Sequence, residues 1–492
     1  MSHSIEMWDA LREHSRGFSA RPAVRMADAT LTFAELFATA ERAARVLRRA
    51  GVAERSYVVF AAPNSLGFVP ALLALWRLSA TVGLFSPLNG PSELLAVADE
   101  TRPSGYLVPT ALAKSWGPAL GARAHELEVD IAGASFSFLF PRATDGNEVA
   151  ADAALIKYTS GSTGRPKGIA LTADNLLAEA EAVIKTLGIT PADAILAPVP
   201  LCHSYGFDLG GLAMLRSGAT LVPSDVFVAR RVIADLAEGR CSIFLGVPTM
   251  YRMLVDTRLA SAPSLSAARY LLSCTAPLSP SLIAAFHDRF DAAICQHYGS
   301  SEAGAVTTHL PSAVLGRPDS VGQAMQNVTL AISDLSGLEV ARGLEGEVVV
   351  SGPAVARRYV MGAAHDRPLG DGTFRMGDLG VIDTDGFLYL RGRMDQMINV
   401  GGFKVSPVEV AQVLEKYPPV NEAAVIGASD GHGEEVVYAA VTLRLAATET
   451  EIIAFCRSQL ADYKVPRRID IRDELPRGPT GKIRLRPKDV RL

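Results

Sequence analysis

Short runs of apolar residues recur before residue 340, separated by loops rich in Gly, Pro or Ser and by segments of helical periodicity. We predict a helix between Thr172, a residue type that caps helix N-termini, and Gly188, a residue type that ends helices. The apolar runs that predict buried strands span residues 153–158, 242–245, 270–273 and 292–296. Strands that alternate with helices are typical of an α/β fold with largely parallel sheets.

Residues 57–76 carry no charge and are long enough to cross a membrane. Pro63 and Pro70 interrupt this stretch, which therefore predicts a buried strand at 57–62, a turn and a buried helix. The N-terminus lacks a basic segment followed by an apolar run, so no signal peptide is expected. We expect a cytoplasmic protein without an integral membrane segment.

The pattern changes after residue 340. Ser406-Pro-Val-Glu409 predicts a capping box with proline at the first helical position. The segments expected to form strands or helices in this part are strands 345–350, 387–390, 423–426 and 469–471, and helix 450–460. We therefore predict a large N-terminal domain over residues 1–394 and a small domain over residues 395–492.

Composition limits the classes of function. The chain has 492 residues, 49% of them hydrophobic, which suits at least two domains with sizeable cores. Its formal net charge of −4 gives no overall basic field for nucleic acid. Five scattered cysteines without a C-x-x-C pair argue against a disulfide framework or a zinc site and suit a reducing cytosol. Residues 464–492 are basic, which fits either a solvated face or a phosphate-rich ligand nearby.

The segment from Tyr158 to Gly168 reads Tyr-Thr-Ser-Gly-Ser-Thr-Gly-Arg-Pro-Lys-Gly and follows a predicted strand. Small residues let backbone N–H groups approach phosphates, hydroxyls add donors, and Lys167 adds a positive charge. The Walker A pattern of P-loop ATPases is absent.

This segment resembles the phosphate loop of the adenylate-forming superfamily, which includes acyl- and aryl-CoA synthetases, adenylation domains of nonribosomal peptide synthetases, and firefly luciferase. Further motifs follow in the family's order over about residues 30–490: 200–205, 273–277, 296–302, 375–379, 390–395 and 476–483. The resemblance implies a large N-terminal domain of mixed and parallel sheets wrapped by helices, with a small mobile α+β C-terminal domain.

The resemblance also implies a nucleotide site. Tyr298 would stack on adenine, Asp378 would accept hydrogen bonds from both ribose hydroxyls, and Glu302 with Thr159 would hold Mg²⁺. The residues assigned to ATP and AMP are Thr159, Ser160, Gly161, Ser162, Thr163, Gly164, Lys167, Thr275, Ala276, Pro277, His297, Tyr298, Gly299, Ser300, Ser301, Asp378, Arg393 and Lys482.

Two positions depart from the family pattern. Ser301 stands where threonine is commoner and keeps the hydroxyl, whereas Met376 replaces a threonine without a functional interpretation.

A second set of residues is implied for the acid and for coenzyme A. His203 would line the acyl site and gate the tunnel for the pantetheine arm, and Asp395 would be the hinge between domains. The residues assigned to the acyl pocket and tunnel are His203, Ser204, Tyr205, Asp208, Gly246, Cys274, Gly299, Gly401, Gly402, Phe403 and Lys404.

These assignments imply a two-step reaction. A carboxylate attacks the α-phosphate of ATP, while Lys482, Lys167 and Mg²⁺ at Glu302 balance the negative charge that develops. A thiol then displaces AMP from the acyl-adenylate. We predict an ATP-dependent acyl-CoA synthetase whose substrates are a small-molecule carboxylic acid and coenzyme A and whose catalytic residues are Lys482, Glu302 and Lys167.

Alternatives remain open at this point. Amino-acid-activating domains usually have an aspartate directly after the position of His203, whereas Ser204 is there and Asp208 falls one helical turn away. A ligase that loads an acyl carrier protein is a closer alternative, and a luciferase-like oxygenase a more distant one. A non-catalytic binding protein of the same fold is expected to lose the charged residues that this chain keeps. The identity of the acid and the oligomeric state do not follow from the sequence.

Overall fold

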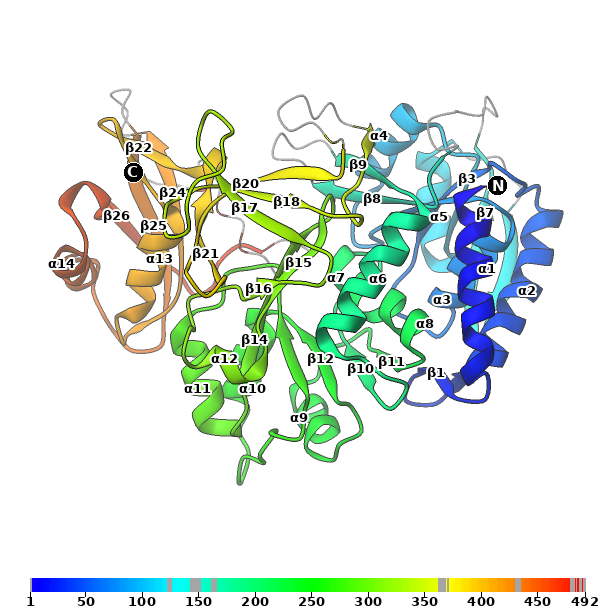
Figure 1. Cartoon of the computed structure of the whole chain (residues 1–492), viewed down its shortest axis with the longest axis horizontal. Coiled ribbons are helices and arrows are strands. Elements are labelled where there is room, and N and C mark those ends of the chain that lie inside the picture. Colours follow the sequence, from blue (N-terminus) through cyan, green and yellow to red (C-terminus); the bar gives the residue numbers. More distant parts are fainter. Residues whose placement is uncertain are drawn as a thin grey trace.

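The computed structural model of the chain describes residues 2–121, 126–141, 152–160, 166–361, 369, 371–429, 435–477, 483, 485 and 489. Figure 1 shows a large body of sheets and helices, with a smaller C-terminal unit at the end opposite to the N-terminal helices. The predicted fold class, α/β with large N-terminal sheets and a smaller C-terminal unit, is confirmed.

The first large sheet has parallel strands in its middle and antiparallel strands near its edges. Because neighbouring parallel strands run in one direction, their carboxyl ends lie along one edge, where ligands commonly bind. In spatial order its strands are β16 (Gln323–Ala324), β15 (Gly304–Thr308), β14 (Ile294–Ser300), β13 (Tyr270–Ser273), β12 (Ile243–Gly246), β10 (Ala194–Ala197), β11 (Thr220–Pro223), β1 (Pro22–Arg25) and β2 (Thr30–Thr32).

The second large sheet has the same design, with a parallel centre and antiparallel edges. Its strand β8 ends in the predicted phosphate loop and pairs with β9 on the far side of that loop. In spatial order its strands are β19 (Arg358–Met361), β9 (Pro166–Leu171), β8 (Leu155–Ser160), β4 (Thr81–Phe85), β3 (Tyr57–Ala61), β5 (Gly105–Pro109), β7 (Ala134–Leu139) and β6 (Glu126–Ile131).

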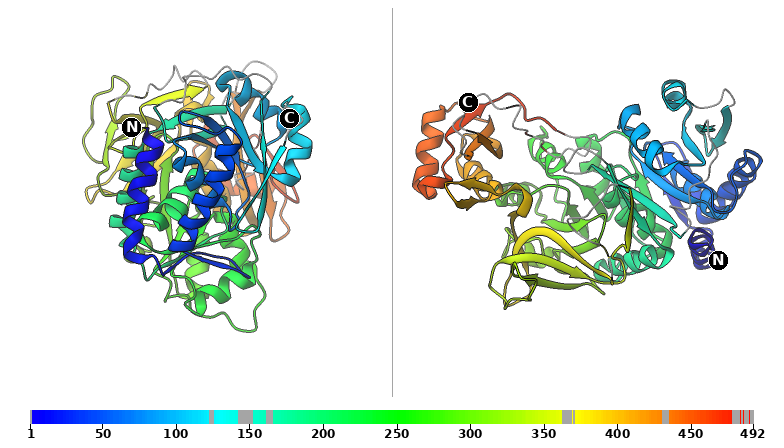
Figure 2. Two further views of the ribbon diagram at one scale, coloured as in Figure 1. Left: turned by 90° about the vertical axis from the view of Figure 1, so that its right-hand side faces the viewer. Right: turned by 90° about the horizontal axis from the view of Figure 1, so that it is seen from above.

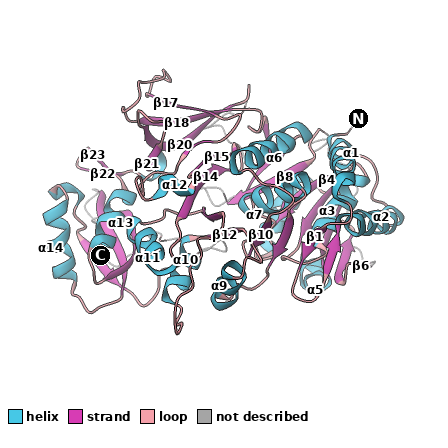
Figure 3. Ribbon diagram, turned by 60° about the horizontal axis from the view of Figure 1, so that its bottom comes forward, coloured by secondary structure: helices cyan, strands magenta, loops and turns pink. Residues whose placement is uncertain are grey.

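Helices lie on both sides of the large sheets (Figure 3), and side chains from both sheets share one hydrophobic core. The helix predicted after Thr172 is confirmed: Thr172 and Asn175 form a capping box, and Gly188 ends the helix with φ 58°. The helices of this part are α1 (His3–Ser15), α2 (Phe33–Arg49), α3 (Phe68–Arg77), α4 (Pro91–Thr101), α5 (Thr110–Ala119), α6 (Ala173–Leu187), α7 (Ser204–Gly206), α8 (Ala213–Ser217), α9 (Ala229–Ala237), α10 (Pro248–Asp256), α11 (Pro280–Phe290) and α12 (Pro311–Val314).

The uncharged stretch at 57–76 forms the buried strand β3 and most of the helix α3, as predicted. Trp76 near the end of α3 is fully buried, and its indole N–H donates to the carbonyl of Ala154. In the part of the chain that the structure describes, no helix is both long enough and apolar enough to cross a bilayer.

A four-stranded antiparallel sheet follows, with an apolar core that includes Val348, Phe374 and Leu388. Its register places Asp378 directly opposite Arg393. In spatial order its strands are β17 (Thr329–Ser333), β18 (Gly346–Ser351), β20 (Thr373–Ile382) and β21 (Leu388–Arg393).

The C-terminal unit has a core of its own between one sheet and two helices (Figure 2, orange and red). The predicted capping box at its first helix is half formed. The Ser406 hydroxyl accepts a hydrogen bond from the N–H of Glu409, but the Glu409 carboxylate binds Nζ of Lys464 at 2.7 and 2.9 Å. The elements of the unit are η4 (Met394–Gln396), β22 (Ile398–Val400), β23 (Phe403–Val405), α13 (Pro407–Lys416), β24 (Val420–Ser429), β25 (Glu435–Leu443), α14 (Glu449–Gln459), η5 (Asp462–Lys464) and β26 (Arg468–Ile471).

Candidate active site

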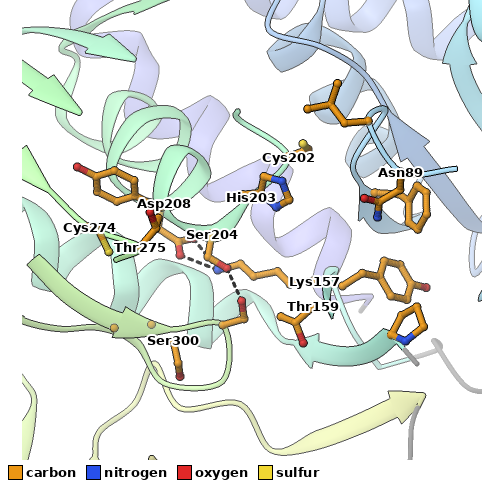
Figure 4. Close-up of a pocket in the computed structure, with 18 of the residues that line it drawn as sticks. Asn89, Lys157, Thr159, Cys202, His203, Ser204, Asp208, Cys274, Thr275 and Ser300 are labelled. Carbon is orange, nitrogen blue, oxygen red and sulfur yellow. Dashed lines mark hydrogen bonds and ion pairs between the residues drawn. The ribbon is translucent and has the colours of Figure 1, made fainter. Parts of the chain in front are cut away.

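A cavity of about 640 Å³ lies where the two large sheets approach each other, beside the end of β8 (Figure 4). Side chains from β8, β14, β15 and the segment that leads into α7 line it. Residues predicted for the nucleotide or the acid that line this cavity are Thr159, His203, Ser204, Tyr205, Asp208, Cys274, Thr275, His297, Gly299, Ser300 and Ser301. The structure therefore brings together segments that lie more than 100 residues apart.

Three buried polar atoms at this cavity have no hydrogen-bond partner among the described residues: Nε2 of His203, Oγ1 of Thr275 and Nδ1 of His297. Burial lowers the pKa of His203, and it lowers the pKa of His297 to about 4, so both rings are neutral at neutral pH. An unpaired buried polar atom costs free energy. A ligand that supplied the missing hydrogen bonds would recover that free energy.

Thr275 adopts a φ of 75°, a left-handed conformation that β-branched residues rarely adopt. Such backbone strain clusters at active sites, ligand clamps and switch regions. Thr275 also lines a second cavity of about 540 Å³. It therefore stands between the two cavities.

Three residues that the resemblance assigns to the nucleotide, Tyr298, Asp378 and Arg393, lie together. The Tyr298 hydroxyl donates to Oδ2 of Asp378 at 2.5 Å, and Nη1 of Arg393 lies 3.5 Å from Oδ1 of the same carboxylate. Arg393 also donates to both carboxylate oxygens of Asp395, at 3.1 and 3.2 Å. This chain of contacts links β14 of the first sheet to β20, β21 and the start of the C-terminal unit.

A second polar group surrounds Glu302. Tyr359 on β19 donates from its hydroxyl to Oε1 of Glu302 at 3.2 Å. Nζ of Lys167 lies 5.9 Å from the centre of the Tyr359 ring. One tyrosine thus contacts a carboxylate through its hydroxyl and an ammonium group through its ring.

A hydrogen bond joins the acid and nucleotide motifs. The hydroxyls of Ser204 and Ser301 lie 2.7 Å apart. Tyr205, the next residue, stacks against His297 with ring centres 5.9 Å apart and donates to the carbonyl of Leu272. The segment after His203 is thereby fixed against β13 and β14.

Comparison with known proteins decides the family. The family model described as AMP-binding enzyme matches residues 11–360, and the one described as AMP-binding enzyme C-terminal domain matches residues 409–482. The chain belongs to the AMP-binding enzyme family. The predicted resemblance to the acyl-CoA synthetase branch of the adenylate-forming superfamily is confirmed.

Relatives and solved structures match over nearly the whole chain. A feruloyl-CoA synthase of Amycolatopsis sp. is 33% identical over 94% of this chain and 94% of the relative. An oxalate–CoA ligase of Arabidopsis thaliana is 32% identical over 93% of this chain and 92% of the relative. The ATP-bound crystal structure of MatB from Rhodopseudomonas palustris superposes with a TM-score of 0.85 at 25% identity, covering 98% of this chain and 97% of that one.

Several predicted residues of this AMP-binding enzyme lie apart from the first cavity. Ala276, Pro277 and Asp395 line the second cavity. Gly246 is not among the residues that line the first cavity, and its Cα faces the rings of Phe244 and Tyr251. The assigned roles of these residues remain predictions.

The segment predicted to line the coenzyme A tunnel, Gly401 to Lys404, is exposed around the β22–β23 hairpin. The Phe403 side chain is 58% exposed and stacks on Tyr463 with ring centres 4.7 Å apart. The predicted residues Gly161, Ser162, Thr163, Gly164 and Lys482 lie outside the described residues, as does the side chain of Ser160.

Sequence reasoning missed two charged residues at the site. Nζ of Lys157 lies 2.7 Å from both carboxylate oxygens of Asp208. Oε1 of Glu179 accepts from the N–H of Ala305 at 2.8 Å. Both residues carried a signal, because Lys157 interrupts an apolar strand and Glu179 lies on the apolar face of α6.

Asp208 lies in a π-helical turn, η3 (Phe207–Leu212), that follows α7. Such turns are found frequently at functional sites. Asp208 lines the cavity as predicted, but its carboxylate is already bound to Lys157. Met376, for which the sequence gave no functional interpretation, is buried with its sulfur 3.9 Å from the Ser300 hydroxyl, and its carbonyl accepts from Arg393.

Proposed function

We propose that this chain is an ATP-dependent acyl-CoA synthetase that converts a carboxylic acid first to an acyl-adenylate and then to an acyl-CoA. This is the reaction class predicted from the sequence, and the CoA ligases among its relatives bear it out. The single observation that carries the proposal for this site is the Ser204–Ser301 hydrogen bond. This contact supports an acid-binding cavity next to the residues assigned to AMP.

In the first half-reaction the acid would occupy the cavity of about 640 Å³ with its carboxylate near Thr159 and His203. Neutral His203 can hydrogen-bond the acid without adding a charge. Asp378 would bind the ribose, and its contacts with Tyr298 and Arg393 hold the carboxylate in place for that task. Fixed partners of this kind lower the barrier by positioning the reactants.

Glu302 and Thr159 fit a magnesium site of the kind in which one carboxylate and substrate phosphates share the ion. Oε1 of Glu302 is oriented by Tyr359, and Lys167 lies against the same ring. A bound Mg²⁺ would balance negative charge on the phosphate oxygens. Lys482, outside the described residues, keeps its proposed role as the cation that stabilises the charge developing at the α-phosphate.

In the second half-reaction the thiol of coenzyme A would attack the acyl carbonyl and AMP would leave. We propose that the unit after residue 394 rotates about Asp395 to bring the exposed Gly401–Lys404 segment to the cavity. The Arg393–Asp395 contact is the connection that such a rotation would change. A cytoplasmic location, in keeping with five free cysteines, completes the proposal.

The alternatives are less well supported. An amino acid substrate needs a carboxylate for its ammonium group, and the carboxylate of Asp208 is bound to Lys157. Transfer to a carrier protein is not favoured, since the relatives are CoA ligases.

Exchange of labelled pyrophosphate into ATP tests the first half-reaction alone. With a panel of carboxylic acids and no coenzyme A, the proposal predicts acid-dependent exchange and an acyl-AMP mass. Exchange that no acid stimulates would contradict it.

A further inference from the structure

One wall of the first cavity contains an ion pair that the proposed reaction does not use. Lys157 on β8 and Asp208 in the π-helical turn both line the cavity, and their side chains are 5% and 4% exposed. Nζ of Lys157 lies 2.7 Å from each carboxylate oxygen, and Figure 4 draws this contact as a dashed line. A buried ion pair is weak evidence for stability, because desolvation offsets much of the attraction.

Glu179 stands behind the same wall. Oε1 accepts from the N–H of Ala305, while Oε2 has no hydrogen-bond partner among the described residues. A Cβ atom on Gly304, which lines the cavity, would lie 1.9 Å from Oε2, so this carboxyl group contacts the cavity wall at that point. Burial and the negative charge of Asp208 raise the pKa of Glu179 to about 8. This shift favours the protonated, uncharged form of Glu179, which leaves Lys157 and Asp208 to balance each other's charge in this wall.

This neutral wall has unused hydrogen-bonding capacity. An ammonium group has three donors and a carboxylate about four acceptor positions, whereas the Lys157–Asp208 contact uses only part of each. A hydroxyl can accept from Lys157 and donate to Asp208 at the same time. A second carboxylate would add an unbalanced buried charge, and a methyl group would make neither hydrogen bond.

The rest of the lining is mixed: aromatic and apolar side chains, among them Phe85, Tyr205 and Leu209, alternate with polar ones such as Asn89 and Glu93. The aromatic and apolar side chains suit an apolar carbon frame. We propose that the acid carries, besides its reacting carboxylate, an uncharged hydroxyl group on an apolar frame, and that Lys157 and Asp208 select it. This inference rests on the proposed function and names the class of acid.

Matched triplets of acids test the inference. Each triplet keeps one frame (benzoate, cinnamate or a medium-chain alkanoate) and carries a hydroxyl, a methyl or a second carboxylate at the same position. The expected result is a kcat/KM for pyrophosphate release about 10- to 100-fold higher for the hydroxy acid than for its methyl partner, the range for a hydrogen bond to a charged group. The dicarboxylate is expected to be poorest.

Variants connect that preference to the ion pair. Removing one partner leaves a buried charge and endangers folding, so the variant is the double Lys157→Met, Asp208→Leu, since an apolar pair of similar volume is often tolerated. It should reverse the preference toward the methyl acids. Asp193→Asn is the control, because it alters an ion pair between buried Asp193 and partly exposed Arg269, neither of which lines the cavity. The control should keep the hydroxyl preference.

The outcomes separate the inference from the proposed function. Equal rates for hydroxyl and methyl partners, or a preference that survives in the double variant, would overturn the inference and leave the function standing. Absence of acid-dependent pyrophosphate release with every triplet would contradict the function instead. Binding of the matched acyl-sulfamoyl adenosines needs no turnover and can be measured by calorimetry. The inference would then be tested by whether the hydroxy compound binds more tightly than its methyl partner by the same factor.

Discussion

The Tyr298 hydroxyl donates a hydrogen bond to Oδ2 of Asp378 over 2.5 Å. The two residues belong to different sheets, since Tyr298 lies on β14 and Asp378 on β20. Their contact links the first large sheet to the four-stranded sheet at the proposed ribose site. Arg393 lies directly opposite Asp378 on β21 and contacts the same carboxylate.

Replacing Asp378 should weaken ATP binding. Asp378→Asn keeps the shape but removes the charge that would strengthen hydrogen bonds from the ribose hydroxyls. We expect kcat/KM for ATP to fall about 10- to 100-fold, measured by pyrophosphate release at saturating acid. Tyr298→Phe is the control, because it removes the oriented hydroxyl and keeps the ring, and it should cost less. An unchanged kcat/KM for ATP in Asp378→Asn would mean that Asp378 does not bind the ribose.

The metal assignment predicts a magnesium-dependent defect in Glu302→Gln. Loss of the carboxylate should lower pyrophosphate release by about 10²–10³ and raise the Mg²⁺ concentration needed for half-maximal rate. Tyr359→Phe keeps the Glu302 carboxylate and removes only its hydrogen bond. It should therefore show a smaller shift. If both variants followed the wild-type magnesium titration, Glu302 would have no role in holding the ion.

We assign Lys482 to the first half-reaction and the Gly401–Lys404 segment to the second. Variants at these two places should therefore affect different half-reactions. Lys482→Ala should lower adenylation by about 10²–10³, the scale for one preorganised charge donor, while thioester formation from supplied acyl-adenylate largely survives. Gly402→Val should do the reverse, because Gly402 has φ +89°, a conformation that a β-branched residue rarely adopts. Rapid-quench measurement of each half-reaction checks both variants. Equal damage to both half-reactions by Lys482→Ala would contradict the proposed rotation.

Glu179 predicts a pH dependence of stability. Its pKa is about 8 in the folded protein against an ordinary value of 4.5, so between these pH values the folded state binds more protons than the unfolded state. The free energy of unfolding should therefore fall as pH rises through this window. Glu179→Gln removes the titration and keeps an acceptor for the Ala305 N–H. Chemical denaturation at about pH 5.5 and about pH 8 should show a smaller loss in the variant, by at least about 1 kcal/mol. Identical losses would mean that Glu179 is not protonated in the native state.

Much of the fold followed from local patterns. The helix between Thr172 and Gly188 was predictable because a capping residue and a glycine enclose an amphipathic segment, and both ends formed as expected. The capping box predicted at Ser406 formed only in its serine half. Lys464, which is distant in sequence, binds the Glu409 carboxylate that the other half needs. A sequence pattern cannot reveal such a tertiary competitor.

Motifs assign residues to the site from the sequence alone, but they do not reveal where side chains from separate elements meet. The resemblance to the adenylate-forming superfamily assigned Tyr298, Glu302 and Asp378 to the nucleotide and metal site. It gave no indication that Lys157 on one sheet would pair with Asp208 on a π-helical turn. That pairing depends on how the two large sheets approach, and only a three-dimensional structure contains this information.

The most direct measurement is a reaction of the protein with ATP, Mg²⁺ and a panel of carboxylic acids, with and without coenzyme A, followed by mass spectrometry of the products. The account predicts pyrophosphate with every accepted acid, acyl-AMP when coenzyme A is omitted, and acyl-CoA with AMP when it is present. Acyl-AMP that accumulates and never yields acyl-CoA would contradict the account.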